Sequence, residues 1–272
     1  MKKKKRNIFI LTIIALASVA FAVFYGLSRK TSPEYPQINF VGGDIKVSVT
    51  ATDEELLKGV TATDPEDGDV TDSLVVEGLT NLIKGKKINV TYAAIDSENH
   101  VTKATRTVKF IDYKSPHFTL SAPLIFRLSN DINLLGIAGA EDIFDGDISS
   151  NLKYSMSDDI SFDTIGEYEV KLIVTNRLGD TEKLPLTVEI TDEDPNCEAI
   201  TLTDYLVYIN KGDEFDAEDY VESYYVGSEK HESASGLKIT DDVDTEEPGV
   251  YTVDYEYTGK NPFRTRLVVV VE

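Results

Sequence analysis

Residues 166–174 read GEYEVKLIV, and this stretch decides which kind of fold we expect. Apolar side chains stand at every second position from Tyr168 to Val174, while Glu and Lys fill positions 167, 169 and 171. Successive side chains of a strand point to opposite faces, so this alternation predicts a strand with one buried and one exposed face. Residues 249–257, GVYTVDYEY, alternate in the same way. Both stretches therefore predict strands that cover a core on one side.

The strand pattern returns along the chain at a nearly constant spacing. Residues 90–94 align with 170–174 at a shift of 80, and residues 166–172 align with 249–255 at a shift of 83. A short polar turn and a closing strand follow each time, as in an antiparallel hairpin. Repeats of this kind predict a chain of similar domains. The predicted domains are residues 37–113, 114–192 and 193–272, the last being the most divergent.

Helical signal is sparse in the body of the chain. The best helix candidate is residues 216–227, DAEDYVESYYVG, where Asp216 could cap the first turn and Gly227 could end the last. Elsewhere, short strands alternate with turns rich in Gly and Asp. This organisation predicts an all-β fold of tandem β-sandwiches joined by short linkers.

The N-terminal segment has the features of a membrane anchor. Residues 1–6 form a basic tail, residues 7–28 are uncharged, and residues 29–36 form a spacer. A helix over residues 7–28 would be about 33 Å long, enough to cross a bilayer. The basic tail predicts a cytoplasmic N-terminus and an extracellular body on a single-pass protein. Small-residue patterns at 18–20 and 20–22 leave signal-peptide cleavage, and hence secretion, as an alternative.

The charge and cysteine content restrict the partners. The formal net charge is −21, and residues 1–30 hold seven Lys and Arg with no Asp or Glu, so the remainder is still more acidic. Such a body repels nucleic acid and favours cations or basic partners. The one cysteine, Cys197, excludes an intrachain disulfide. An exported chain without disulfides must rest on its hydrophobic cores, as is typical of bacterial surface proteins.

Residues 59–76, GVTATDPEDGDVTDSLVV, together with residues 88–110 resemble the bacterial immunoglobulin-like repeats of Gram-positive surface proteins. Units of that family pair a D-x-x-DGD turn with a late D-x-x-G-N hairpin. Here Asn99-His100 replaces Gly-Asn, the second repeat changes the hairpin turn, and the third lacks DGD. The resemblance extends over about residues 37–272 and is strongest in the first repeat. It implies immunoglobulin-like sandwiches with an external structural or binding role, and no reaction.

Two acidic turns, TDPEDGDVT at 63–71 and EDIFDGDIS at 141–149, lie 78 positions apart. In one interpretation the aspartates accept hydrogen bonds from the loop backbone, and glycine supplies the positive φ of the turn. In the other, the turns bind calcium as a cofactor, although the spacing is not that of an EF-hand. The candidate calcium ligands are Asp64, Glu66, Asp67, Asp69, Asp142, Asp145 and Asp147.

Tyrosine is concentrated in the third repeat, which holds 8 of the 14 tyrosines. Tyrosine offers a large rigid contact area with a polar tip and is favoured at binding surfaces. Tyr220, Tyr224 and Tyr225 are therefore the candidate ligand-binding residues. The alternative is that these rings fill a core in a chain without tryptophan.

No enzyme motif accompanies these features. The three histidines, at 100, 117 and 231, have no metal-ligand spacing, and no phosphate-binding glycine loop is present. We therefore expect a non-catalytic surface stalk or spacer, which would span roughly 100 Å with its domains end to end. The alternative is an adhesin whose distal domain binds a cell-wall component, a host protein or a glycan.

Overall fold

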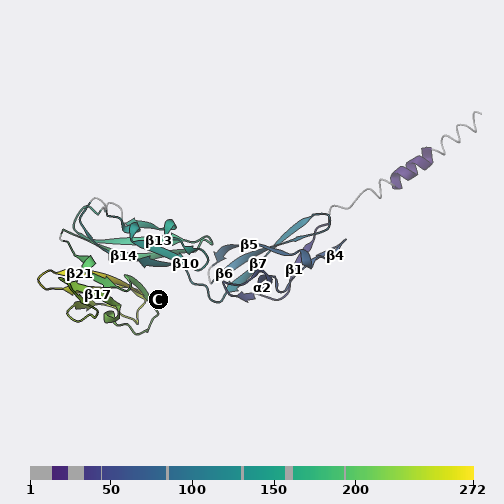
Figure 1. Cartoon of the computed structure of the whole chain (residues 1–272). Coiled ribbons are helices and arrows are strands. Elements are labelled where there is room, and N and C mark those ends of the chain that lie inside the picture. Colours follow the sequence, from purple (N-terminus) through teal and green to yellow (C-terminus); the bar gives the residue numbers. More distant parts are fainter. Residues whose placement is uncertain are drawn as a thin grey trace, which may run out of the picture. The chain divides into compact units, whose positions relative to one another are not determined.

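The structure is a computed structural model of the chain (Figure 1). It describes residues 14–23, 34–43, 45–83, 86–129, 132–156, 162–192 and 194–272. These form two compact units, Met1–Thr80 with Lys87–Phe110, and Asn81–Lys86 with Ile111–Glu272. Strands and turns account for almost all of the body, so the predicted all-β class is confirmed.

Only part of the expected anchor falls within the described residues. Residues 14–23 are helical and exposed. None of the helices in the described ranges is both long and apolar enough to cross a membrane. The remainder of the expected span, at 7–13 and 24–28, lies outside those ranges, as do the tail at 1–6 and residues 29–33 of the spacer.

The first unit contains one sandwich of two sheets. One sheet consists of β1 (Gln37–Phe40), β3 (Val60–Asp64) and β4 (Gly68–Asp69). The other consists of β2 (Ile45–Val47), β7 (Val101–Phe110), β6 (Lys87–Ile95) and β5 (Val75–Ile83). Every second side chain of β6 from Ile88 to Ala94 is buried, as the alternating sequence predicts. The rings of Phe40 and Tyr92, 5.5 Å apart, connect the two sheets.

A short helix, α2 (Asp53–Leu57), precedes β3. Thr52 and Glu55 form a capping box at its start. At its end, the buried Arg106 donates to the carbonyl oxygen of Leu56 at 2.8 Å, and Tyr92 donates to the same oxygen at 2.8 Å. These bonds satisfy a carbonyl that the helix leaves without a partner, and they tie α2 to the sheet.

The second unit contains two further pairs of sheets. The second sandwich has β8 (His117–Leu120), β10 (Ala138–Asp142) and β11 (Gly146–Asp147) opposite β9 (Ile125–Arg127), β12 (Lys153–Met156), β13 (Gly166–Thr175) and β14 (Thr181–Thr191). The third has β15 (Ile200–Leu202), β17 (Val221–Val226) and β18 (Glu229–His231) opposite β16 (Leu206–Ile209), β19 (Lys238–Asp241), β20 (Gly249–Tyr257) and β21 (Phe263–Val271). Alternate residues of β13 from Tyr168 to Val174 are buried, as predicted.

The helix predicted over residues 216–227 is wrong. Only Ala217–Tyr220 forms a single 3-10 turn, which Asp216 caps by accepting from Glu218 N–H at 2.9 Å. The following residues form β17, which pairs with both β15 and β18. Valine and tyrosine favour strands, and the two neighbouring strands override the weak helical pattern.

The second and third sandwiches share a core through β21. Leu267 and Val269 point into the core of the third sandwich, while Val268 and Val270 pack with the core of the second. At the same boundary, Phe118 N–H donates to the Tyr208 hydroxyl oxygen at 3.0 Å. These two sandwiches therefore do not follow each other as separate links, which the end-to-end stalk estimate assumed.

Candidate functional site

The first acidic turn joins β3 to β4 and is held by its own carboxylates. Asp64, at the end of β3, accepts from the N–H groups of Glu66 and Asp67 at 2.8 and 3.0 Å through Oδ1. Asp67 accepts from Ser97 N–H at 2.7 Å, which attaches the turn to the β6–β7 hairpin. Asp69 accepts from Thr71 N–H at 2.9 Å, and hydrogen bonds from Thr71 hold the pKa of Asp69 below its ordinary value.

The second acidic turn, between β10 and β11, repeats this arrangement. Asp142 Oδ1 accepts from the N–H groups of Phe144 and Asp145 at 2.9 and 3.0 Å. Asp145 accepts from Arg177 N–H at 2.7 Å and pairs with its Nε at 2.9 Å. Asp147 accepts from the hydroxyl of Ser149 at 2.6 Å, and the hydrogen bonds of Ser149 lower the pKa of Asp147.

These bonds confirm the loop-tying interpretation of the acidic turns. Gly68 and Gly146 have φ values of +79° and +67°, which glycine adopts without strain. Glu66 is exposed at the surface of the first turn. In the described part of the chain, no group of three or more His, Cys, Asp or Glu residues is placed to hold a metal ion. Calcium binding stays a prediction.

The sequence analysis identified the hairpin turns but missed that each one binds the side chains of an acidic turn. Asn176 is 4% exposed, and its Nδ2 donates to Asp142 Oδ2 at 2.9 Å and to the Tyr113 hydroxyl at 3.1 Å. Its Oδ1 accepts from the N–H groups of Leu178 and Asp180 at 3.0 and 2.9 Å. The repeat spacing could have indicated this role, because Asp96 occupies the equivalent position of the first repeat, 80 residues before Asn176.

Tyr113 closes the same network. Its hydroxyl donates to Asp180 Oδ2 at 2.6 Å, and its ring stacks on Phe144 at 5.7 Å. Burial and the neighbouring Asp180 carboxylate hold the pKa of Tyr113 above its ordinary value. We call Asp142, Asn176, Tyr113 and Asp180 the second corner. The corresponding positions Asp64, Asp96 and His100, with the nearby Tyr35, form the first corner.

The three candidate tyrosines do not form one patch. Tyr224 is 2% exposed, stacks on His231 at 4.7 Å and donates to the carbonyl oxygen of Ser235. Tyr220 is half-buried and stacks on Phe215 at 5.5 Å. Tyr224, on β17, belongs to the core of the third sandwich, and Tyr220, in the 3-10 turn Ala217–Tyr220, packs against that core. Only Tyr225, on the opposite face of β17, is exposed, at 46%.

Tyr225 lines a groove of about 660 Å³ on the third sandwich, which we call the Tyr225 groove. Asn196, Lys260, Asn261 and Pro262 also line it. An exposed aromatic ring can support an apolar ligand face, while amide and ammonium groups can bind hydroxyl or carbonyl oxygens. The groove therefore combines the two kinds of contact that a polar organic ligand with an apolar face requires.

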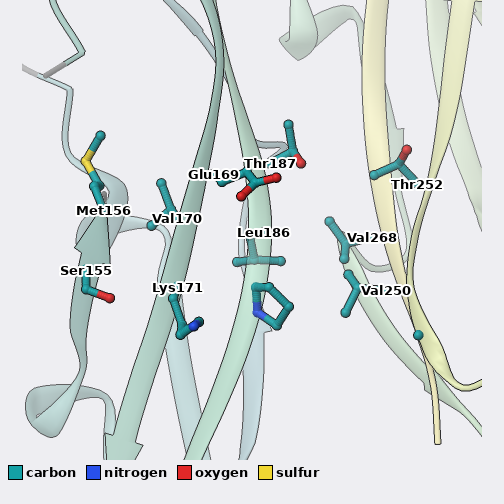
Figure 2. Close-up of a pocket in the computed structure, with 12 residues that line it drawn as sticks. Ser155, Met156, Glu169, Val170, Lys171, Leu186, Thr187, Val250, Thr252 and Val268 are labelled. Atoms are coloured by element: carbon teal, nitrogen blue, oxygen red, sulfur yellow. The ribbon is translucent and has the colours of Figure 1, made fainter. Parts of the chain in front are cut away.

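A second groove of about 660 Å³ lies where the second and third sandwiches meet (Figure 2). Figure 2 shows Glu169 and Lys171 on β13 and Val250 and Thr252 on the side of the third sandwich. The lining combines apolar side chains with three hydroxyl groups, one carboxylate and one ammonium group, and it contains no aromatic ring. It is thus a less favourable ligand site than the Tyr225 groove.

No protein-family model matches the sequence, and no curated protein matches it. Among solved structures, the chain is similar to a Clostridium perfringens ZmpB structure of CBM51-2 and INT domains in complex with GlcNAc, at 16% identity and a TM-score of 0.22. That likeness covers 57% of this chain and 41% of the other. The protocadherin GammaB4 extracellular domain matches at 14% identity and a TM-score of 0.21, over 88% of this chain and 49% of the other.

Mouse cadherin-23 EC22-24 is similar at 14% identity and a TM-score of 0.18, over 88% of this chain and 99% of the other. This chain spans less than half the length of each of the first two proteins. At identities and TM-scores this low, the likenesses assign no ligand or partner to the chain.

Proposed function

We propose that the chain is an exported, non-catalytic protein of immunoglobulin-like sandwiches that acts as a structural module outside the cell. The observation that carries this proposal is the use of the acidic turns. The carboxylates of Asp64, Asp67, Asp142 and Asp145 accept hydrogen bonds from the loops around them. Groups engaged in this way stabilise a scaffold.

The proposal includes a membrane tether at residues 7–28. The basic residues at 2–6 and the uncharged run that follows support it, and they favour a cytoplasmic N-terminus. The test is protease treatment of intact cells that produce the full chain with a C-terminal tag. The tag should be lost from intact cells, and the untreated chain should remain with the membrane fraction. A tag protected in intact cells and digested only after lysis would refute export.

Signal-peptide cleavage is the competing outcome for this segment. It predicts release of the body into the medium and a mature N-terminus after one of the small-residue patterns at 18–20 or 20–22. Mass spectrometry of the intact chain from the membrane and the medium distinguishes the two outcomes. Export is common to both, so this measurement tests the tether alone.

The Tyr225 groove favours a second candidate function, recognition of a glycan. The exposed ring of Tyr225 lies beside Lys260 and Asn261, and sugar rings combine an apolar face with hydroxyl groups in the same way. The second and third sandwiches share a core, so the groove is carried by a two-sandwich body.

The test is binding of the full chain to cell-wall glycans and to defined oligosaccharides, with Tyr225→Ala as the variant. Tyr154→Ala is the matched control, because Tyr154 is 42% exposed on the second sandwich, outside the Tyr225 groove. Recognition at this groove requires a loss of at least about tenfold in affinity for the first variant and no change for the second. Equal binding by both variants would exclude the groove and leave the structural role unaffected.

A further inference from the structure

Three segments that are distant in the sequence meet at the Tyr225 groove. Tyr225 comes from β17, and Asn196 comes from the segment that enters the third sandwich. Lys260 and Asn261 come from the turn between β20 and β21. Asn196 Nδ2 donates to the Pro262 carbonyl oxygen at 3.2 Å, which attaches this turn to the entering segment. The walls of the groove are therefore held in place before a ligand binds, and this lowers the entropic cost of binding.

The charge of the groove differs from that of the sandwich that carries it. Residues 193–272 include 20 acidic and 6 basic residues. Among the described residues, no Asp or Glu lines the Tyr225 groove, and its one charged lining residue is Lys260. The groove thus presents a positive charge beside an aromatic ring on an otherwise acidic sandwich.

The ammonium group of Lys260 is available to a ligand. Carboxylates already pair with four of the six basic residues of this sandwich, namely Lys230, Lys238, Arg264 and Arg266. Lys260 is exposed, and it forms no ion pair with any residue in the described part of the chain. Such an ammonium group can donate charge-assisted hydrogen bonds to an anionic ligand.

A smaller groove of about 220 Å³ shares Pro262 with the Tyr225 groove but has the opposite charge character. Its lining includes Asp194 and Glu256, and its one cation, Arg264, is already bonded to Glu189. Carboxylates in the lining repel a negatively charged ligand group. A negative group on a ligand is therefore favoured in the Tyr225 groove and disfavoured in its neighbour.

We propose that the ligand of the Tyr225 groove is an acidic sugar, whose carboxylate binds Lys260 while its ring lies on Tyr225. This inference rests on the second candidate function, glycan recognition. The Asn261 amide can both donate to and accept from the hydroxyl groups of the sugar. A neutral sugar can use the same ring and amide, but it offers Lys260 only hydroxyl groups. The groove should therefore prefer acidic sugars to neutral ones.

The acidic residues elsewhere on the sandwich oppose this attraction at a distance. At physiological ionic strength, exposed charges more than about 8 Å apart are largely screened, whereas a carboxylate in contact with Lys260 is screened less. A partly exposed ion pair of this kind contributes about twofold to fivefold in affinity. The charge preference should therefore be modest, and the aromatic ring should contribute more to the affinity.

The test is isothermal titration calorimetry of the full chain, in detergent and at about 0.15 M salt, with trigalacturonate and with its neutral methyl ester. The acid should bind about twofold to fivefold more tightly than the ester. Lys260→Gln should remove this preference, and the ratio of the two affinities cancels any general effect of the substitution on the groove. Lys211→Gln is the matched control, because it removes a positive charge from an exposed residue of the same sandwich outside the groove. This control should keep the preference.

The outcomes separate this inference from the candidate function on which it rests. Equal affinity for acid and ester, with both reduced by Tyr225→Ala, would retain glycan recognition and overturn the preference for acidic sugars. Equal losses of preference in Lys260→Gln and Lys211→Gln would show that only net charge acts, and would overturn it as well. If neither sugar binds, or if Tyr225→Ala has no effect, glycan recognition at the groove fails together with the inference.

An acidic peptide is the other anionic ligand to be compared. Triglutamate provides carboxylates without a sugar ring, so it lacks the apolar face that packs on Tyr225. It should bind at least about tenfold more weakly than trigalacturonate. Binding of triglutamate as tight as that of trigalacturonate would assign the groove to acidic peptides and overturn the proposal.

Discussion

Replacing Asn176 with alanine should unfold the second corner, because four hydrogen bonds meet on this one side chain. Nδ2 donates to Asp142 and Tyr113, and Oδ1 accepts from the N–H groups of Leu178 and Asp180. The variant leaves the carboxylate oxygen of Asp142 without a donor in a residue that is 6% exposed. Alanine cannot replace any of these bonds.

The cost follows from the groups that lose their partners. A buried acceptor left without a donor costs about 1 to 3 kcal/mol, more when it is charged, and each loop N–H contributes about 0.5 to 1.5 kcal/mol. The expected loss in the free energy of unfolding of the second unit is therefore about 3 to 5 kcal/mol. Asn151→Ala is the matched control in the same sandwich, because its exposed side chain makes one long bond of 3.4 Å to the Thr175 carbonyl oxygen.

Urea unfolding followed by circular dichroism measures the loss, and hydrogen exchange assigns the transition to the second unit. The assignment matters because a chain with two units does not unfold in one two-state step. We expect a large shift for Asn176→Ala and less than about 0.5 kcal/mol for Asn151→Ala. A loss below about 1 kcal/mol for Asn176→Ala would show that the corner does not hold the sandwich together, and the structural role of the acidic turns would fail with it.

Three further predictions concern other parts of the fold. Arg106→Met should destabilise the first unit by about 2 to 4 kcal/mol in urea unfolding, because it removes one of two buried donors to the Leu56 carbonyl oxygen and the donor to the Tyr92 hydroxyl. Lys103→Met, at the surface, should have little effect. Glu189→Gln should increase hydrogen exchange in β21, since Glu189 accepts from Arg264 Nη1 at 3.0 Å, and unchanged exchange would contradict this. Because hydrogen bonds lower the pKa of Asp147, its contribution to stability is complete above about pH 4 and is lost as the pH falls further, which exchange at the Ser149 amide should detect.

The strands could be predicted because one face of each is more exposed to solvent than the other. In β6 and β13 the alternation fixes which side chains are buried, and the structure follows it from Ile88 to Ala94 and from Tyr168 to Val174. The acidic turns were recognisable for a related reason, since Asp and Gly carry the turn geometry in their own side chains and backbone. Sequence patterns therefore predict structure well where it depends only on residues close together in the sequence.

The sequence analysis failed where contacts with segments distant in the sequence determine which side chains are buried or bonded. The alternation of β17 is interrupted, so the sequence could not separate the buried Tyr224 from the exposed Tyr225. The partner of Asn176 lies 34 positions away at Asp142, and no local pattern connects them. Burial on both faces of β21 did leave a signal, because residues 267–271 read LVVVV without alternation. A strand of this kind requires a cover on each side, and the shared core of the second unit supplies the second cover.

That shared core also explains how the third sandwich folds without an acidic corner. The first two sandwiches each attach a DGD turn to a hairpin turn through a carboxylate, by Asp67 to Ser97 and by Asp145 to Arg177. The third has no DGD turn, but Val268 and Val270 of its last strand are buried against the second sandwich. Burying a valine side chain stabilises the fold by about 1.5 to 3 kcal/mol. A hydrogen bond to a charged group, such as the carboxylate in each corner, contributes a similar amount. Packing against a neighbouring sandwich thus supplies the third sandwich with stability that the other two obtain in part from a corner.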